Sequence, residues 1–384
     1  SGKIAAHYSF DKGSSEQNYP ASLMGSIALL KQTFYDAQYY NRLNKKDYTD
    51  ISLEAWADLQ KYPQIFEVDD LLSLLRADKL GDEFGVQYII KGNGDEYQRI
   101  EEVKKTNASL IIPVNFPEPI DFTNSFEEEM VELKDLKHWE MAPTVFADLE
   151  QNNISFAITT HGLKKTSDFL KNIRRAIEYG MSEQAALKSL TETPAALLGV
   201  NDMVGSLKSG YLANFVITSG NIFDANAIIY ENWIQGEKFV IHDLNQEDYN
   251  GVYQLKIEDK VWKLQISGKP EKSVFKIILN DTTEIKADGT IENNVIALNF
   301  KEHKDKVGKI RLSGWIKNKT FTGTGFLPDG EKINWSARFQ SKSDDKKEKK
   351  KDNITSETGS KLYPFVAYGF QEKPKQAKYL VKNA

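Results

Sequence analysis

Short apolar runs alternate with helical patterns along the first two hundred residues. Runs rich in β-branched and aromatic side chains predict four strands, at 64–68, 87–91, 109–114 and 154–160. After them, apolar residues recur at helical spacing, which predicts helices at 71–84, 95–105, 143–151, 167–179 and 182–193. Strand–helix repeats of this length are typical of a parallel sheet covered by helices, and four of them amount to half of a (β/α)8 barrel.

A further helix is predicted at 21–43, before the first of these strands. Its apolar face is formed by Leu23, Ile27, Leu30, Phe34 and Ala37. His7 lies in the short sequence before this helix, and we expect it near the mouth of the barrel.

The pattern changes at about residue 248, where polar and apolar residues begin to alternate. We expect strands at 252–257, 261–266, 274–279, 295–300, 309–316, 321–326 and 333–339. Turns are expected at Ala287-Asp288-Gly289 and Pro328-Asp329-Gly330. The pattern predicts an antiparallel meander that forms a sandwich or small barrel, with Trp262, Trp315 and Trp335 in its core.

Between these two regions lies the most specific motif of the chain. It contains Thr193-Pro194-Ala195, Leu198-Gly199, Gly205-Ser206-Leu207, Gly210 and Ala213. We expect a helix to end at Thr193-Pro194 and a strand to run from Asn214 to Thr218. The motif resembles the C-terminal signature of the amidohydrolase superfamily, in which the chain leaves the last barrel helix for a β-sandwich.

This resemblance implies the fold class and the domains. The class is α/β plus all-β: the second half of a TIM-type (β/α)8 barrel with sandwich strands, then the antiparallel meander. The expected domains are the partial barrel at 1–200, sandwich strands at 201–245, the β domain at 246–342, a charged linker at 343–362 and the start of a following β-sandwich at 363–384. We expect the sequence to be an internal segment of a longer polypeptide, which carries a second amidohydrolase unit downstream.

Composition excludes several classes of function. The net charge of −5 gives no general attraction to nucleic acid, and the lysine block near residue 346 is interleaved with acidic residues. No apolar run is long enough to span a bilayer. The chain has no Cys, which excludes disulfides and thiolate metal sites and leaves both cytoplasmic and extracytoplasmic locations open.

The resemblance also implies where catalytic residues should stand. The superfamily binds zinc-like ions with a His-x-His on strand one, a His each on strands five and six, and an Asp on strand eight. Here Glu67 stands at the end of the strand-five equivalent, Lys91 at strand six and His161 after strand eight. An ammonium group does not bind metal and repels a cation. We therefore expect a degenerate site with no metal bound in this segment, in which Lys91 pairs with Glu67. Zinc or another divalent metal remains an expectation for the parent chain.

Three functions remain open. The first, which we favour, is a degenerate amidohydrolase module with a structural role in a larger hydrolase of C–N bonds, amide or cyclic amide. The second is an active metal-dependent hydrolase that combines Glu67 and His161 with ligands from the missing half. The third is a binding module formed by the meander. The expected partners are the rest of the same polypeptide and a second copy in a homo-oligomer, with no nucleic acid and no membrane.

Overall fold

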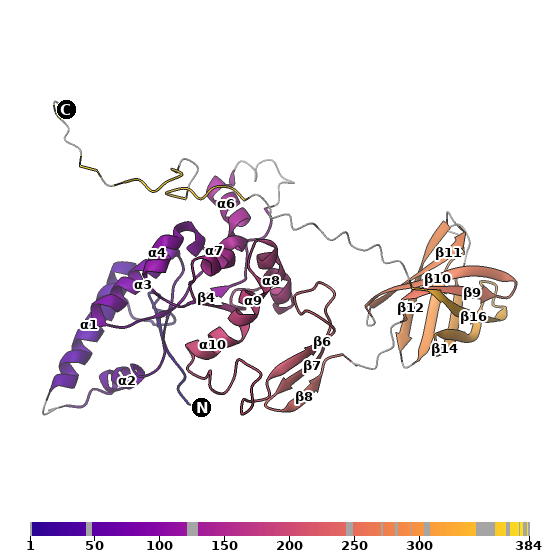
Figure 1. Cartoon of the computed structure of the whole chain (residues 1–384), viewed down its shortest axis with the longest axis horizontal. Coiled ribbons are helices and arrows are strands. Elements are labelled where there is room, and N and C mark those ends of the chain that lie inside the picture. Colours follow the sequence, from indigo (N-terminus) through magenta and orange to yellow (C-terminus); the bar gives the residue numbers. More distant parts are fainter. Residues whose placement is uncertain are drawn as a thin grey trace. The chain divides into compact units, whose positions relative to one another are not determined.

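The computed structural model describes residues 2–43, 48–120, 130–242, 249–269, 272–280, 283–292, 294–302, 308–342, 358–365, 369–375, 377–378 and 382. They form two compact units, residues 1–241 with 354–384 and residues 242–353 (Figure 1). The domain boundaries given above remain predictions. Most of the predicted linker at 343–362 and most of the final stretch 379–384 lie outside the described residues.

The first unit contains a five-stranded parallel sheet, as the pattern predicts. Its strands follow one another in chain order, β1 (Ala6–Ser9), β2 (Gln64–Glu67), β3 (Ile89–Lys91), β4 (Leu110–Pro113) and β5 (Phe156–Thr159). The four predicted strands and their parallel pairing are confirmed. The additional strand β1 was not predicted, because its sequence AHYS has no continuous apolar run.

Helices follow the strands and cover the sheet (Figure 1). They are α1 (Leu23–Arg42), α2 (Ile51–Leu59), α3 (Leu71–Phe84), η1 (Glu96–Arg99), α4 (Ile100–Lys105), α6 (Leu133–Met141), η2 (Ala142–Thr144), α7 (Val145–Gln151), η3 (Thr166–Asp168), α8 (Phe169–Glu178), α9 (Glu183–Leu190) and α10 (Glu192–Leu197). Asp70 begins α3 by accepting a hydrogen bond from the Ser73 amide, and Gly85 ends it with a positive φ of 69°. Among the described residues, every helix is too short or too polar to cross a membrane.

Two helix predictions need correction. The helix predicted to end at Thr193-Pro194 ends at Leu190, and α10 then runs through both residues. Pro194 is compatible with α10 because it lies in its first turn, where its missing N–H is not needed. The segment around His138, for which the sequence pattern predicts no helix, is helix α6, and the His138 ring stacks on Tyr97 and hydrogen-bonds its hydroxyl.

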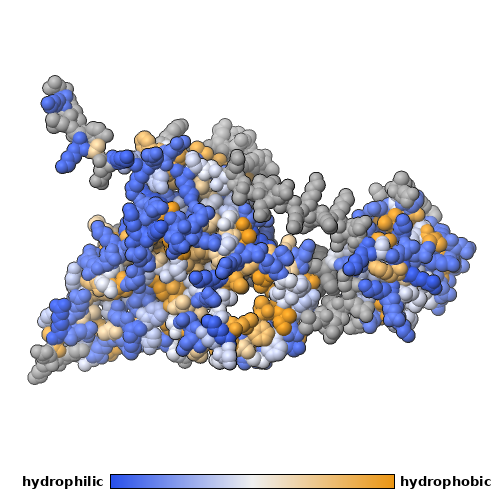
Figure 2. Space-filling model, in the orientation of Figure 1, coloured by the Kyte–Doolittle hydropathy of each residue, from blue (hydrophilic) through white to orange (hydrophobic). Residues whose placement is uncertain are grey.

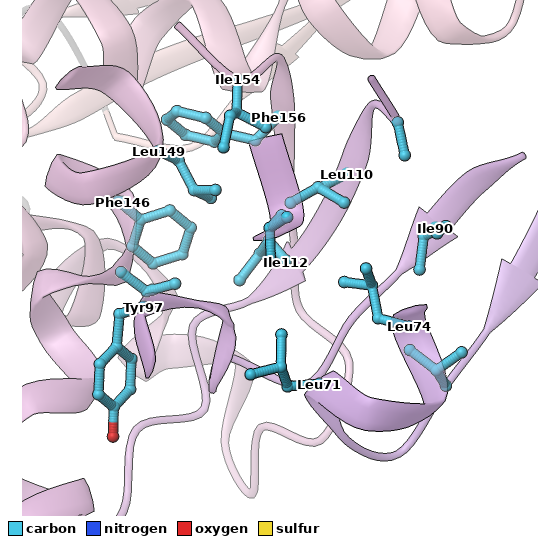
Figure 3. Close-up of a cluster of buried hydrophobic side chains, with 14 of the residues drawn as sticks. Leu71, Leu74, Ile90, Tyr97, Leu110, Ile112, Phe146, Leu149, Ile154 and Phe156 are labelled. Atoms are coloured by element: carbon cyan, nitrogen blue, oxygen red, sulfur yellow. The ribbon is translucent and has the colours of Figure 1, made fainter. Parts of the chain in front are cut away.

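One face of the parallel sheet packs against the helices to form the core of this unit. Side chains from alternate strand positions and from the covering helices meet there (Figure 3). The residues drawn and labelled in Figure 3 are Leu71, Leu74, Ile90, Tyr97, Leu110, Ile112, Phe146, Leu149, Ile154 and Phe156. Leu74, Ile90, Leu110 and Phe146 are completely buried, so we attribute most of the stability of the sheet to this contact.

The chain then forms a small antiparallel sheet, as the amidohydrolase resemblance implies. Its strands are β6 (Phe215–Thr218), β7 (Ile229–Ile234) and β8 (Glu237–Val240). Phe215 and Trp233 stack on one of its faces, with ring centroids 5.4 Å apart.

The second unit is a closed antiparallel barrel of eight strands. They are β9 (Gly251–Ile257), β10 (Lys260–Lys269), β11 (Lys272–Asn280), β12 (Thr283–Glu292), β13 (Val295–Phe300), β14 (Ile310–Lys317), β15 (Thr320–Phe326) and β16 (Lys332–Ser341). The last strand pairs with the first, which leaves no open edge. Trp335 fills the interior beside Gly314 and donates its indole N–H to the Ser313 and Thr324 carbonyls at 3.1 and 3.2 Å.

Two predictions for the meander were wrong. Ala287-Asp288-Gly289 is not a turn but lies inside β12, where a Cβ on Gly289 would come within 2.6 Å of the Leu298 side chain. Asp-Gly therefore marks a crowded strand position here. Trp315, expected in the core, points outward and is 70% exposed. The turn at Pro328-Asp329-Gly330 is confirmed.

A buried carboxyl group shapes the turn after β3. Glu96 is 1% exposed, and its Oε1 accepts a hydrogen bond from the Asn93 amide at 3.0 Å. A Cβ on Gly92 would lie 1.8 Å from that oxygen, so the turn requires glycine. Glu96 Oε2 has no partner among the described residues. Burial, and secondly the charge of Asp95, raise the Glu96 pKa from 4.5 to about 7.

This shift predicts a pH dependence of stability. Because the folded chain binds the Glu96 proton more tightly than the unfolded chain, stability should fall as the pH rises from about 4.5 to about 7. Glu96→Gln, which is neutral throughout, should remove this dependence and gain on the order of 2–3 kcal/mol relative to wild type between pH 5 and pH 8. Urea unfolding at pH 5 and pH 8 measures the free energy of unfolding of wild type and Glu96→Gln, with the exposed Glu178→Gln variant as control. Parallel pH profiles of wild type and Glu96→Gln would contradict it.

Candidate functional site

The register of the parallel sheet brings the predicted site residues to its carboxyl edge. Ser9 of β1 pairs with Glu67 of β2, and Glu67 pairs with Lys91 of β3. Glu67 and Lys91 lie on the sheet face opposite the apolar core, because the strand positions beside them, Phe66 and Ile90, belong to the core. This edge is where barrel enzymes place their catalytic residues.

Glu67 and Lys91 form an ion pair. Lys91 Nζ donates to Glu67 Oε1 at 2.5 Å, and the Lys91 side chain is only 15% exposed, whereas Glu67 is 44% exposed. The pairing expected from the sequence is therefore present. The hydrogen bond from Lys91 lowers the pKa of Glu67 below its ordinary value, with smaller contributions from the charges of His161 and His7, and partial burial opposes them.

His161 joins this pair from the far side of the sheet. Its Nε2 lies 3.8 Å from Glu67 Oε1, although β5 and β2 are separated by two strands. In a flat sheet these strands would lie about 14 Å apart. Curvature of the barrel type brings their ends closer, and the two side chains span the remaining distance. The structure thus brings Glu67, Lys91 and His161 together. The charge of His7 also acts on the Glu67 carboxylate.

We asked whether these residues could hold the metal ion that the resemblance implies. A zinc-type site needs three or four nitrogen or oxygen ligands around one point. Glu67 and His161 supply one carboxylate and one imidazole, and the Lys91 ammonium occupies the immediate neighbourhood of the carboxylate. Within the described ranges, no group of three or more His, Asp or Glu side chains could hold a metal. These residues therefore do not fit a catalytic metal centre.

The sequence reasoning missed a cleft beside this cluster. The cleft has a volume of about 490 Å³ and lies between the segments that follow β4 and β5. It is lined by Asn115, Phe116, Pro117, Glu118, Pro119, Gly162, Leu163, Lys164, Asp168, Lys171, Asn172 and Arg175. The sequence signal for this cleft is the density of basic residues between Lys164 and Arg175, part of which lies within the helix predicted at 167–179.

The ion pair generates a prediction. Lys91→Met should raise the Glu67 pKa toward 4.5, because the hydrogen bond that favours the carboxylate is lost. The pair stabilises the fold above about pH 4.5, and this contribution disappears as the pH falls through the lowered pKa. The stability lost at neutral pH should be about 1 kcal/mol or less, since Glu67 is partly exposed. Carbon-detected NMR titration of Glu67 measures the shift, with Lys104→Met as control, and an unchanged Glu67 pKa would contradict it.

Part of this chain is similar to known amidohydrolases. The model of the amidohydrolase family matches residues 139–263. No curated protein sequence matches the chain. Among solved structures, an amidohydrolase from Thermotoga maritima MSB8 is 21% identical with a TM-score of 0.46, over 58% of this chain and 57% of that one. A second amidohydrolase is 13% identical (TM-score 0.39; 62% and 68% covered), and a prolidase complexed with N-methylphosphonate-L-proline is 9% identical (0.36; 62% and 68%).

The chain spans a little over half the length of the Thermotoga maritima protein. The family match covers α7, α8, α9 and α10, the motif at 193–213 and the strands β6, β7 and β8. It therefore includes all of the residues on which the sequence resemblance was based. The predicted amidohydrolase resemblance is confirmed for this part of the chain, because the family model matches residues 139–263.

Proposed function

We propose that this chain is a degenerate amidohydrolase module with a structural role in a larger hydrolase of C–N bonds, amide or cyclic amide. One observation carries the proposal: Lys91 Nζ lies 2.5 Å from Glu67 Oε1, at the barrel edge where the superfamily binds its metal. A fixed ammonium group at this distance opposes a dication electrostatically, and it already satisfies the carboxylate that would bind one. The ion pair instead ties β2 to β3.

Two features of the fold support a partner that completes the module. The parallel sheet ends at β1 and β5, and among the described residues neither strand has a neighbour on its outer side. Open parallel edges invite pairing. The small sheet also carries an exposed apolar face, where Val216, Ile234, Phe239 and Ile241 lie on the same side by strand alternation and are 43–53% exposed. Figure 2 shows apolar residues over these strands.

The partner we propose is the remainder of an amidohydrolase barrel and its β-sandwich, from the same polypeptide. Additional parallel strands between β5 and β1 would close the barrel, since eight strands form this architecture. A second sheet layer over β6, β7 and β8 would bury their apolar face. The additional parallel strands would place Glu67 and Lys91 inside a closed barrel mouth.

A second function remains a candidate because of one observation. Glu67 and His161 approach within 3.8 Å from different strands, so two metal-binding groups do meet. If Lys91 moved away and the partner supplied further ligands, these groups could take part in an active metal-dependent hydrolase. The metal test below separates the two functions.

Zinc binding tests the proposed loss of the metal centre. Purified residues 1–384, dialysed against a chelator and refilled with zinc, should hold clearly less than one zinc per chain by elemental analysis. The physical reason is the donor set of one carboxylate, one imidazole and one ammonium.

Variants make this measurement specific. Glu67→Gln and His161→Ala should leave the zinc content unchanged, as should the matched control Glu178→Gln on the exposed end of α8. The wild-type chain could instead bind one zinc ion that is lost in Glu67→Gln or His161→Ala but kept in Glu178→Gln. This result would contradict the proposed degenerate site and favour the active hydrolase.

The open edges and the apolar face predict the association state. Residues 1–384 on their own should form dimers or larger aggregates. Pairing would satisfy the open backbone groups of the strand edges and bury the exposed apolar face. Light scattering coupled to size exclusion measures this. Replacing Val216 and Phe239 by Thr on the exposed face should reduce association, whereas Val261→Thr on the outside of the other unit should not. A clean monomer at high concentration would argue against the need for a completing partner.

A further inference from the structure

The cleft between the segments that follow β4 and β5 has the features of a binding site. Its volume of about 490 Å³ is within the usual range for small-molecule sites. In barrels, the loops after the last two strands often bind oxyanions. The cleft lies outside the Glu67–Lys91 ion pair, since neither residue lines it.

Two contacts hold the cleft in shape. Gly162 is packed against Asn115, because a Cβ at its position, with φ +73°, would come within 2.4 Å of Asn115 Nδ2. Asn172 Nδ2 donates to the Val114 carbonyl at 2.6 Å, which ties α8 to the end of β4. These contacts join both loops to α8, so the lining is built from three connected elements.

The charges of the cleft favour an anion. Lys171 and Arg175 are four residues apart in α8 and share one helix face, and Lys164 reaches the cleft from the preceding segment. Within the described part of the chain, none of these three cations has an ion-pair partner within 4 Å. The carboxylates of Glu118 and Asp168 also line the cleft, which leaves a net single positive charge among the lining side chains.

The remaining surface of the cleft is apolar and would suit an organic group. Phe116, Pro117 and Leu163 contribute to it. The guanidinium of Arg175 lies 5.7 Å from the centre of the Phe116 ring, so a charged group and an aromatic face adjoin each other. Arg presents a planar fork that matches a carboxylate.

From these observations we propose that the cleft binds a small organic monoanion, with its carboxylate toward Arg175, Lys171 and Lys164 and its apolar body against Phe116 and Leu163. This binding requires no metal and no hydrolytic step. It goes beyond the proposed function and can be measured whether or not the metal centre is degenerate.

N-benzoylglycine is a suitable probe, since it joins one carboxylate to an apolar ring, and N-benzoylglycinamide is its uncharged counterpart. On residues 1–384, the side-chain amide signals of Asn115 and Asn172 should shift during NMR titration with N-benzoylglycine. The uncharged amide should cause no saturable shift. Binding should weaken with added salt, as expected for exposed charges.

Variants and a competing anion decide the outcome. Lys164→Gln and Lys171→Gln should each weaken binding about two- to fivefold, a size expected for exposed ion pairs. Both side chains are exposed, so these changes should leave the fold intact, as circular dichroism checks. Lys104→Gln, an exposed lysine on α4, is the matched control and should bind as wild type. Equal binding of the uncharged amide, equal binding of inorganic phosphate, or no effect of either lysine variant would overturn the proposal.

Discussion

The pairing of Glu67 with Lys91 depends on the parallel register between β2 and β3, and the chemistry of the site depends on that pairing. The register places Glu67 beside Lys91, so the partly buried Glu67 carboxylate lies in direct contact with an ammonium group. The pair satisfies both charges without an external ion. The approach of His161 to 3.8 Å adds a third polar group without adding enough ligands for a metal.

We propose that this fold has lost the metal position, but it keeps a packed supporting core. The core behind the sheet is fully packed, with Leu74, Ile90 and Leu110 completely buried. Within the described ranges, the outer edges of β1 and β5 have no neighbouring strand. The apolar face formed by Val216, Ile234, Phe239 and Ile241 is exposed there as well. A module that is well packed inside and open at its edges is suited to hold a larger assembly together, which is the role we propose.

Much of this fold could be predicted from sequence, and the failures have identifiable physical causes. The four strands at 64–160 and the amidohydrolase motif were recognisable because continuous apolar runs and fixed glycine spacing are local signals. Strand β1 was missed because its alternation of buried and exposed positions extends over only four residues, which is too short to be recognised in the sequence. The Asp-Gly pair in β12 was wrongly predicted as a turn. Its glycine is needed because the Leu298 side chain of a neighbouring strand leaves no room for a Cβ, which the local sequence does not show. The Glu67–Lys91 pair was predictable from parallel pairing, whereas the cleft at Lys171 and Arg175 depends on how two distant loops meet α8.

The metal position can be observed directly by anomalous diffraction at the zinc edge, on crystals of residues 1–384 soaked with zinc. We expect Lys91 Nζ to remain in hydrogen-bond contact with Glu67 Oε1, and no anomalous peak within bonding distance of Glu67 and His161. An ordered zinc ion bound by both side chains, with Lys91 displaced from Glu67, would contradict the proposed loss of the metal centre.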